Sequence, residues 1–153
     1  MRAGLRPRSL TGGKMADAVT SQTIVDTDKR VIVKFTNLSD GSGEASVKKV
    51  DVSAFTARSS DSAACSRVTI DQVWYSIGGM RVDLEWAATT NVKALMLGGS
   101  AAAGNVGGHL DFRSFGGLKN TEASGVDGDV DLTTSGHTNL DHYTIVLELR
   151  KSY

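Results

Sequence analysis

The sequence predicts an all-β fold, an antiparallel β-sandwich or jelly-roll-like domain preceded by an extended N-terminal arm. Short segments alternate apolar and polar residues, and turn residues separate these segments at intervals of roughly ten residues, as in sandwiches and barrels. Composition agrees, because 17 of the 153 residues are glycine and only 40% are hydrophobic, which favours a turn-rich β protein over a helical bundle. We expect one β domain over residues 30–153 and an arm over residues 1–29.

The expected strands begin at residue 30 and continue to the end of the chain. The first covers residues 30–35, in which every second residue is apolar: Val31, Val33 and Phe35. The last covers residues 143–150 and has one wholly apolar face, made by Tyr143, Ile145, Leu147 and Leu149. Between these two, we expect strands in chain order at residues 46–52, 68–77, 80–87, 92–97, 110–115 and 130–134.

The connections between these strands carry turn residues. Residues 37–43 form an Asn, Ser, Asp and Gly cluster that is typical of a turn. Residues 53–66 are rich in serine and alanine and fit a short helical turn or a loop. Residues 98–109 are rich in glycine and alanine, have little to bury, and predict a flexible loop. This loop matches neither the dinucleotide fingerprint nor the phosphate-binding P-loop.

Residues 68–86 carry the clearest local pattern. Two strand-like runs flank Gly78 and Gly79, and a glycine pair can supply the positive φ angles of a two-residue hairpin turn. The second run has an apolar and a charged face, Val82, Leu84 and Trp86 against Arg81, Asp83 and Glu85. We therefore expect a β-hairpin whose second strand has one dry face and one wet face.

Charge and hydropathy exclude some classes of partner. The net charge is zero, so no global field attracts nucleic acid or an anionic membrane. No apolar run approaches the roughly 20 residues that span a bilayer. We expect neither a membrane nor a specific nucleic acid as partner.

The first 14 residues are basic and contain no acid. They hold Arg2, Arg6, Arg8 and Lys14. Three interpretations are open: a basic arm that contacts nucleic acid or an acidic partner, a transit peptide, or an extension from an upstream start codon before Met15. We favour the extension, because small residues that are common at protein starts follow Met15.

Residues that could carry catalysis or bind metal are few and scattered. Cys65 is the single cysteine and has no histidine beside it that would activate a thiol. The acids Asp127, Asp129 and Asp131 resemble a calcium loop, but Leu132 stands where such a loop needs glycine. His109, His137 and His142 lack further ligands at zinc spacing. We predict no enzyme, no cofactor and no metal.

Trp74 and Tyr75 are the aromatic residues whose position the pattern does not settle. They are adjacent in an expected strand, so their side chains point to opposite faces of the sheet. We expect one of them near a subunit contact. Trp86 shares its face with Val82 and Leu84, which predicts a place in the core.

Several segments together resemble small virion structural proteins of tailed bacteriophages, especially marine ones. They are KFTNLSDGSGE at 34–44, KVDVS at 49–53, VWYS at 73–76, MRVDLEW at 80–86, TSGHT at 134–138 and YTIVLELR at 143–150. The resemblance covers residues 15–151 and contains no catalytic motif. It implies a structural role in the phage particle, as a head decoration or cement protein or as a small tail component.

We therefore predict a non-enzymatic virion protein that decorates the capsid and stabilises the phage head. Its expected partners are the major capsid protein, other virion proteins and copies of itself, on the particle surface and, during assembly, in the host cytoplasm. The expected subunit contacts are Trp74, Tyr75, Ala16, Val19, Ile24 and Val25. The alternatives are a tail or neck component and, in another class, a carbohydrate-binding module that uses Trp74 or Tyr75 as a sugar platform.

Overall fold

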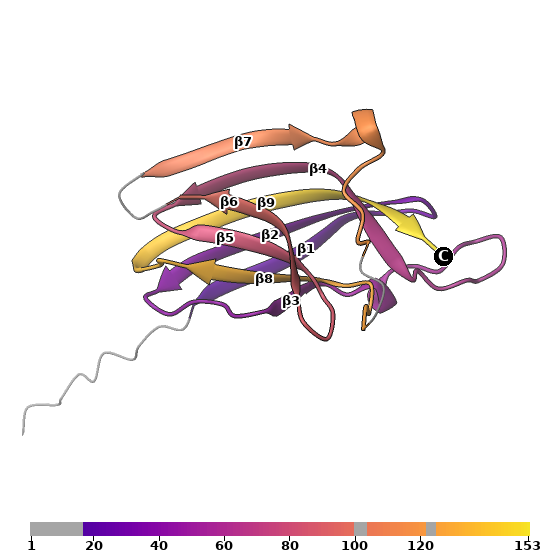
Figure 1. Ribbon diagram of the computed structural model, residues 1–153, viewed down its shortest axis with the longest axis horizontal. Helices are drawn as coiled ribbons and strands as arrows, with labels where there is room; N and C mark the ends of the chain where they lie inside the picture. Colours follow the sequence, from indigo (N-terminus) through magenta and orange to yellow (C-terminus); the bar gives the residue numbers. More distant parts are fainter. Residues whose placement is uncertain (1–16, 100–103, 122–124) are drawn as a thin grey trace, which may run out of the picture.

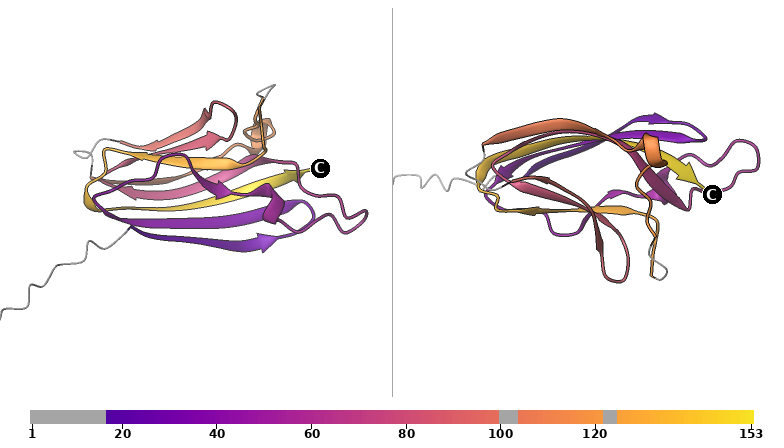
Figure 2. Two further views of the ribbon diagram at one scale, coloured as in Figure 1. Left: turned by 90° about the horizontal axis from the view of Figure 1, so that it is seen from below. Right: turned by 45° about the horizontal axis from the view of Figure 1, so that its top comes forward.

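The computed structural model describes residues 17–99, 104–121 and 125–153, which form two antiparallel β-sheets packed face to face (Figure 1). Figure 2 shows the two layers from two further directions. The predicted all-β sandwich is confirmed. The expected arm and several of the connections differ from the prediction, as described below.

Nine strands build the two sheets. The five-stranded sheet contains, from edge to edge, β1 (Ala18–Asp26), β2 (Arg30–Asp40), β9 (Asn139–Ser152), β4 (Arg67–Gly78) and β7 (Asn105–Asp111). The four-stranded sheet contains β3 (Val47–Val50), β8 (Val130–Ser135), β5 (Arg81–Trp86) and β6 (Val92–Gly98). Single turns of 3-10 helix follow β3 and β7, namely η1 (Val52–Ala54) and η3 (Arg113–Phe115).

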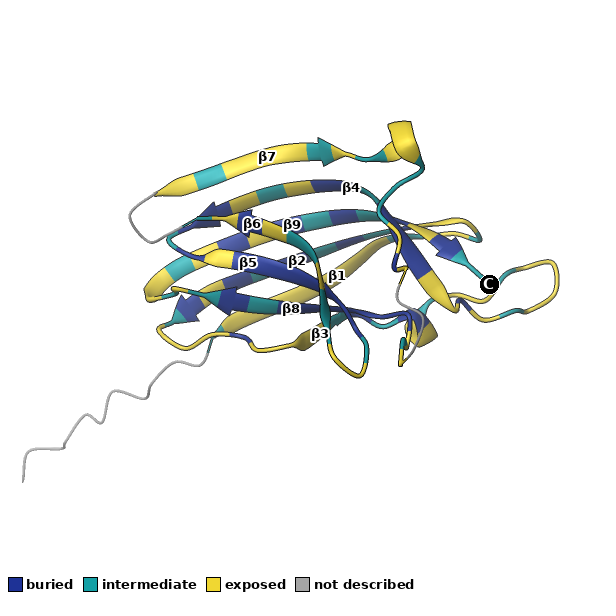
Figure 3. Ribbon diagram, in the orientation of Figure 1, coloured by how far each residue is buried: buried dark blue, intermediate teal, exposed yellow. Residues whose placement is uncertain are grey.

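The core lies between the two layers and is made by the alternating apolar residues of the long strands (Figure 3). Within β2, Val31, Val33 and Phe35 are buried as predicted, because their side chains point toward the opposite sheet. The predicted apolar face of β9 is likewise buried. The other sheet contributes Val82, Leu84, Trp86, Val130 and Leu132 to the same core.

The expected hairpin over residues 68–86 is wrong in its pairing. Strands flank Gly78 and Gly79, but β4 pairs with β7 and β9, whereas β5 pairs with β6 and β8. The turn therefore crosses between the sheets and buries Met80. Gly79 has φ +78°, and a Cβ there would lie 2.0 Å from the Asp141 carboxylate, so this close approach requires glycine. Strands β4 and β5 therefore lie in opposite sheets, and their apolar faces contribute to the core between the sheets instead of belonging to one hairpin.

Part of the expected arm over residues 1–29 is a strand of the sandwich. The second half of the arm forms β1, which pairs with β2 along its length, with Thr20 opposite Thr36. Residues 1–16 lie outside the described part of the chain. The β-branched residues between Val19 and Val25 favour a strand, and this propensity is the signal that the prediction overlooked.

The expected loop over residues 98–109 contains the start of β7, and the expected strand over residues 110–115 ends in η3. Two glycines allow β7 to lie against β4. A Cβ at Gly107 would come within 2.9 Å of the Tyr75 carbonyl oxygen, and one at Gly108 within 3.3 Å of the Tyr75 hydroxyl. The glycines therefore serve close strand packing as well as chain flexibility.

On the expected wet face of β5, Arg81 is exposed but the two acids are buried. Asp83 is 0% exposed and Glu85 is 4% exposed, because basic side chains of β5 and β6 cover them. Asp83 forms ion pairs of 2.9 Å with both Arg81 and Lys93, and Lys93 also pairs with Glu85. Alternation identified the face correctly, but it could not show that neighbouring cations would cover it.

Candidate functional site

Strand β1 is held in place at both ends by aspartates. At its start, the Asp17 carboxylate accepts hydrogen bonds from the Asp40 amide at 2.9 Å and from the Asn37 side chain at 3.1 Å. At its end, Asp26 forms a 2.5 Å ion pair with Lys151 and accepts the Thr56 amide at 2.7 Å. These contacts fix both ends of the strand to the body of the domain.

The electrostatics of Asp26 strengthen this second anchor. Burial alone would raise the pKa of Asp26, but the hydrogen bonds and charge supplied by Lys151 and Thr56 lower it overall. The carboxylate is therefore charged at neutral pH, and it holds the buried ammonium group of Lys151.

Between its two anchors, β1 exposes both of its faces. From Ala18 to Ile24 every residue is exposed, and Val25 is half-buried. Val19 is 41% exposed and Ile24 49% exposed, although both are large and apolar. No residue of the stretch 18–25 carries a charge. The predicted contact residues Val19 and Ile24 are thus accessible to a partner, whereas Ala16 lies outside the described residues.

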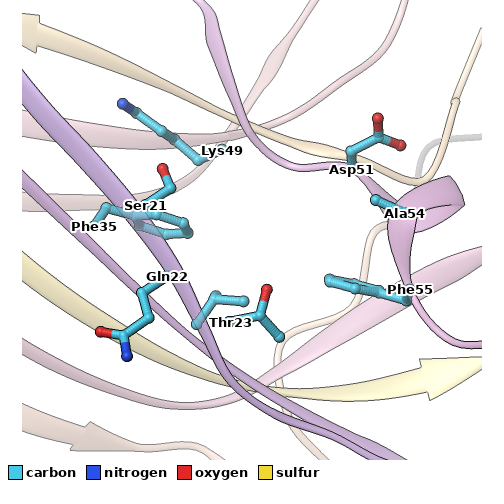
Figure 4. Close-up of a pocket in the computed structure, with 9 residues that line it drawn as sticks. Ser21, Gln22, Thr23, Phe35, Lys49, Asp51, Ala54 and Phe55 are labelled. Carbon is cyan, nitrogen blue, oxygen red and sulfur yellow. The ribbon is translucent and has the colours of Figure 1, made fainter.

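A cleft of about 180 Å³ opens beneath β1, where the two sheets separate. Ser21 and Thr23 of β1 line one side, and Ala54 and Phe55 lie opposite them (Figure 4). Buried residues of β2, Val33 and Phe35, are also part of the lining. The cleft therefore has an apolar part that lies directly inside an exposed sheet edge.

Lys49 lines this cleft and belongs to a buried polar cluster. Its side chain is 2% exposed and forms an ion pair with Glu44, whose side chain is 7% exposed. Glu44 also accepts hydrogen bonds from the Asn37 side chain at 2.9 Å and from the Tyr143 hydroxyl. Burial and the Glu44 carboxylate raise the pKa of Tyr143, so its phenol remains protonated. The cluster joins β2, β3 and β9 and is structural in character.

Trp74 and Tyr75 point to opposite faces of the sheet, as expected. Trp74 is 36% exposed and stacks on His109 of β7 with ring centroids 4.8 Å apart and planes within 6°. His109 is fixed by a 2.8 Å hydrogen bond to Gln72. Tyr75 is half-buried and packs against the core. His109 covers one face of the Trp74 indole, so only the other face could stack on a sugar ring.

The residues weighed as metal ligands or nucleophiles have structural partners. Asp129 pairs with Lys48 at 2.5 Å and accepts the Val52 amide at 2.8 Å. Across residues 17–99, 104–121 and 125–153, no group of three or more His, Cys, Asp or Glu side chains is arranged to hold a metal ion. Cys65 is buried, and this burial raises the pKa of its thiol, which disfavours the reactive thiolate.

Comparisons with protein-family models, with curated proteins and with solved structures found no match to this chain. No helix within the described ranges is long and apolar enough to cross a membrane. The features of the sandwich that bear most directly on function are the anchored, uncharged edge at β1 and the cleft inside it.

Proposed function

We propose that the protein is a non-enzymatic structural component of a tailed-phage particle, a decoration or cement protein that stabilises the head. The observation that carries this proposal is strand β1, which is fixed at both ends, uncharged between residues 18 and 25, and exposed on both faces. An edge of this kind is a template for pairing with another chain. The resemblance of residues 15–151 to virion structural proteins supports the same role.

In the proposed mechanism, many copies of the protein each make the same weak contact on the capsid. Each copy would place its β1 edge and the neighbouring apolar residues against the major capsid protein or another copy on the particle surface. A single such contact is weak, but many symmetric copies on one lattice together raise the free energy needed to separate capsid subunits. Decoration therefore requires a rigid, accessible edge and no catalytic group.

Separated heads and tails test the proposal. Mass spectrometry of tailless heads should detect the protein, and heads without it should lose integrity at a lower temperature or in a milder osmotic shock. A protein present in tails and absent from tailless heads would overturn decoration in favour of a tail or neck component.

A carbohydrate-binding role is a separate alternative and has its own test. Glycan binding that is lost in Trp74→Ala would support that role. The stacking of His109 on Trp74 limits this role, because it leaves only one face of the indole for a sugar ring. An unchanged glycan-array profile for wild type and Trp74→Ala would exclude Trp74 as a platform.

A further inference from the structure

The geometry points to a specific partner for β1, namely β1 of a second copy of this chain. The two strands would run antiparallel across a two-fold axis, so that two five-stranded sheets become one continuous sheet. The inference rests on the proposed function in one respect: it uses the same edge as the assembly surface. It goes further because it names the partner and the geometry of pairing.

The four sheet edges in the described part of the chain are unequally protected against pairing with another strand. Edge strand β3 carries Lys48 and Lys49, and edge strand β6 carries Lys93. Edge strand β7 holds two glycines, a histidine and the terminal Asp111. Charged side chains and short strands are the usual means of preventing edge-to-edge pairing. Strand β1 is the longest of the four edges, and its only charge is its last residue, Asp26.

Strand β1 is also complementary to a second copy of itself. A two-fold axis perpendicular to a sheet places residues of the same face opposite one another in antiparallel strands. Ser21 and Thr23 lie opposite the buried residues Phe35 and Val33 of β2, so alternation places Val19 on the same inner face. The outer face includes Thr20, whose hydroxyl contacts the Thr36 hydroxyl. Since residues 18–25 are uncharged, no like charges oppose each other along the paired stretch.

The cleft inside this edge favours the same pairing. An added strand would lie roughly 4.8 Å beyond β1, across the opening where the sheets separate. Its inner-face residues, including the second Val19, would extend the roof of a cleft whose lining includes Val33, Phe35 and Phe55. In strand addition, main-chain hydrogen bonds supply affinity and alternate side chains fit the adjacent pocket. A second β1 supplies both.

A bulge limits the register of the pair. The regular pairing of β1 with β2 is interrupted between Thr23 and Val25, which leaves a regular stretch over residues 18–23. A bulge disrupts the regular hydrogen-bond pattern at its position. The centre of the regular stretch lies at Thr20 and Ser21, so the two-fold axis should pass close to one of these residues.

Disulfide trapping tests this geometry directly. Thr20→Cys and Ser21→Cys each place a thiol near the expected axis, and a non-hydrogen-bonded pair there brings opposed Cβ atoms to roughly 4.5 Å, which a disulfide can span. The native Cys65 is buried, so it leaves the background low. Asn105→Cys is the matched control, because it is an exposed residue of the opposite edge strand β7.

Under mild oxidation, we expect at least one of the two β1 variants to form a covalent dimer while Asn105→Cys stays monomeric. Failure of both β1 variants to cross-link, or a mixed cross-link between Ser21→Cys and Asn105→Cys proteins, would overturn the two-fold pairing. The virion role and the self-pairing can fail independently of each other. A cross-linked dimer that is absent from particles refutes the virion role alone. A protein found on heads whose β1 variants do not cross-link refutes the self-pairing alone.

Discussion

Strands β1 and β5 reverse the usual relation between residue type and burial. In β5, every residue after Arg81 is buried, and the acids Asp83 and Glu85 are almost as inaccessible as the core residue Leu84. In β1, both faces are exposed, although Val19 and Ile24 are apolar. Neighbouring residues explain the difference: Arg81 and Lys93 cover the acids, whereas Val19 and Ile24 remain exposed within the described part of the chain. Strand β5 therefore neutralises its acids by contacts within one copy, whereas β1 leaves an exposed, uncharged stretch at a sheet edge.

Removing the acid of the most buried ion pair should have the largest effect. Glu44→Ala would leave the Lys49 ammonium buried without its counter-ion, and we expect a loss of about 3–5 kcal/mol in the free energy of unfolding. Urea denaturation measures it. Glu44→Ala combined with Lys49→Met is the matched control and should recover much of the loss. A loss below about 1 kcal/mol in the single variant would contradict a structural role for buried charge.

The ion pairs on β5 should give a smaller effect, because one partner is partly exposed. Lys93→Ala removes a cation from both Asp83 and Glu85, but the Lys93 side chain is 47% exposed and solvent screens its charge. We expect a loss of about 1–2 kcal/mol, between the values for buried and surface ion pairs. Lys93→Arg, which keeps the charge, should lose less than Lys93→Ala in the same urea titration.

Acid should reveal opposite contributions from two neighbouring carboxylates. Burial raises the pKa of Glu85, but Lys93, Asn91 and Ser46 lower it overall, below its ordinary value of 4.5. Its stabilising contribution is therefore present above pH 4.5 and is lost as the pH falls through its folded pKa. Burial, with nearby acids, raises the pKa of Asp131 above 3.8, although Asn91 opposes this shift. Asp131 therefore lowers stability as the pH rises above 3.8.

Variants separate these two contributions. Compared with wild type, Glu85→Gln should lose less stability when the pH is lowered from 6 to about 3, because it lacks the carboxylate that titrates. Asp131→Asn should be as stable as wild type at the lowest pH and more stable than wild type at pH 7. Thermal or urea unfolding across this pH range checks both. The same pH response in both variants would contradict the opposite shifts.

The smallest effect on the isolated chain should come from β1 itself. Val19→Lys changes a side chain that is already 41% exposed, so the unfolding free energy of the monomer should change by no more than about 0.5 kcal/mol. Urea denaturation at a concentration low enough to keep the chain monomeric measures it. A loss similar to that of Glu44→Ala would show that Val19 already has a packing role within one copy.

Alternation in the sequence predicted much of the fold, but not how the strands pair. It identified the inner faces of β2, β5 and β9, because period-two patterning follows directly from strand geometry. It could not show whether Gly78 and Gly79 join paired strands or strands of different sheets, since both arrangements bury the same apolar face. The many glycines of residues 98–109 led to the prediction of a loop and not of β7. Two of them, Gly107 and Gly108, permit close packing of β7 against β4.

The candidate site was predicted only in part. Val19 and Ile24 were identified as contact residues, and they are exposed, but on an anchored strand instead of a free arm. The cleft residues Lys49 and Phe55 were overlooked, because a cleft forms from segments that the chain brings together only on folding. The anchors Asp17 and Asp26 are equally invisible in sequence, since their partners lie far along the chain.

Sedimentation velocity over a range of protein concentrations tests the central claim, that β1 is the edge through which copies assemble. Wild type should shift from monomer toward dimer as its concentration rises, and Val19→Lys should remain monomeric, because a charge on an edge strand blocks pairing. Met96→Lys is the matched control, since Met96 is 63% exposed on edge strand β6, and it should dimerise like wild type. A wild type that stays monomeric throughout, or a Val19→Lys variant that dimerises equally well, would contradict the claim.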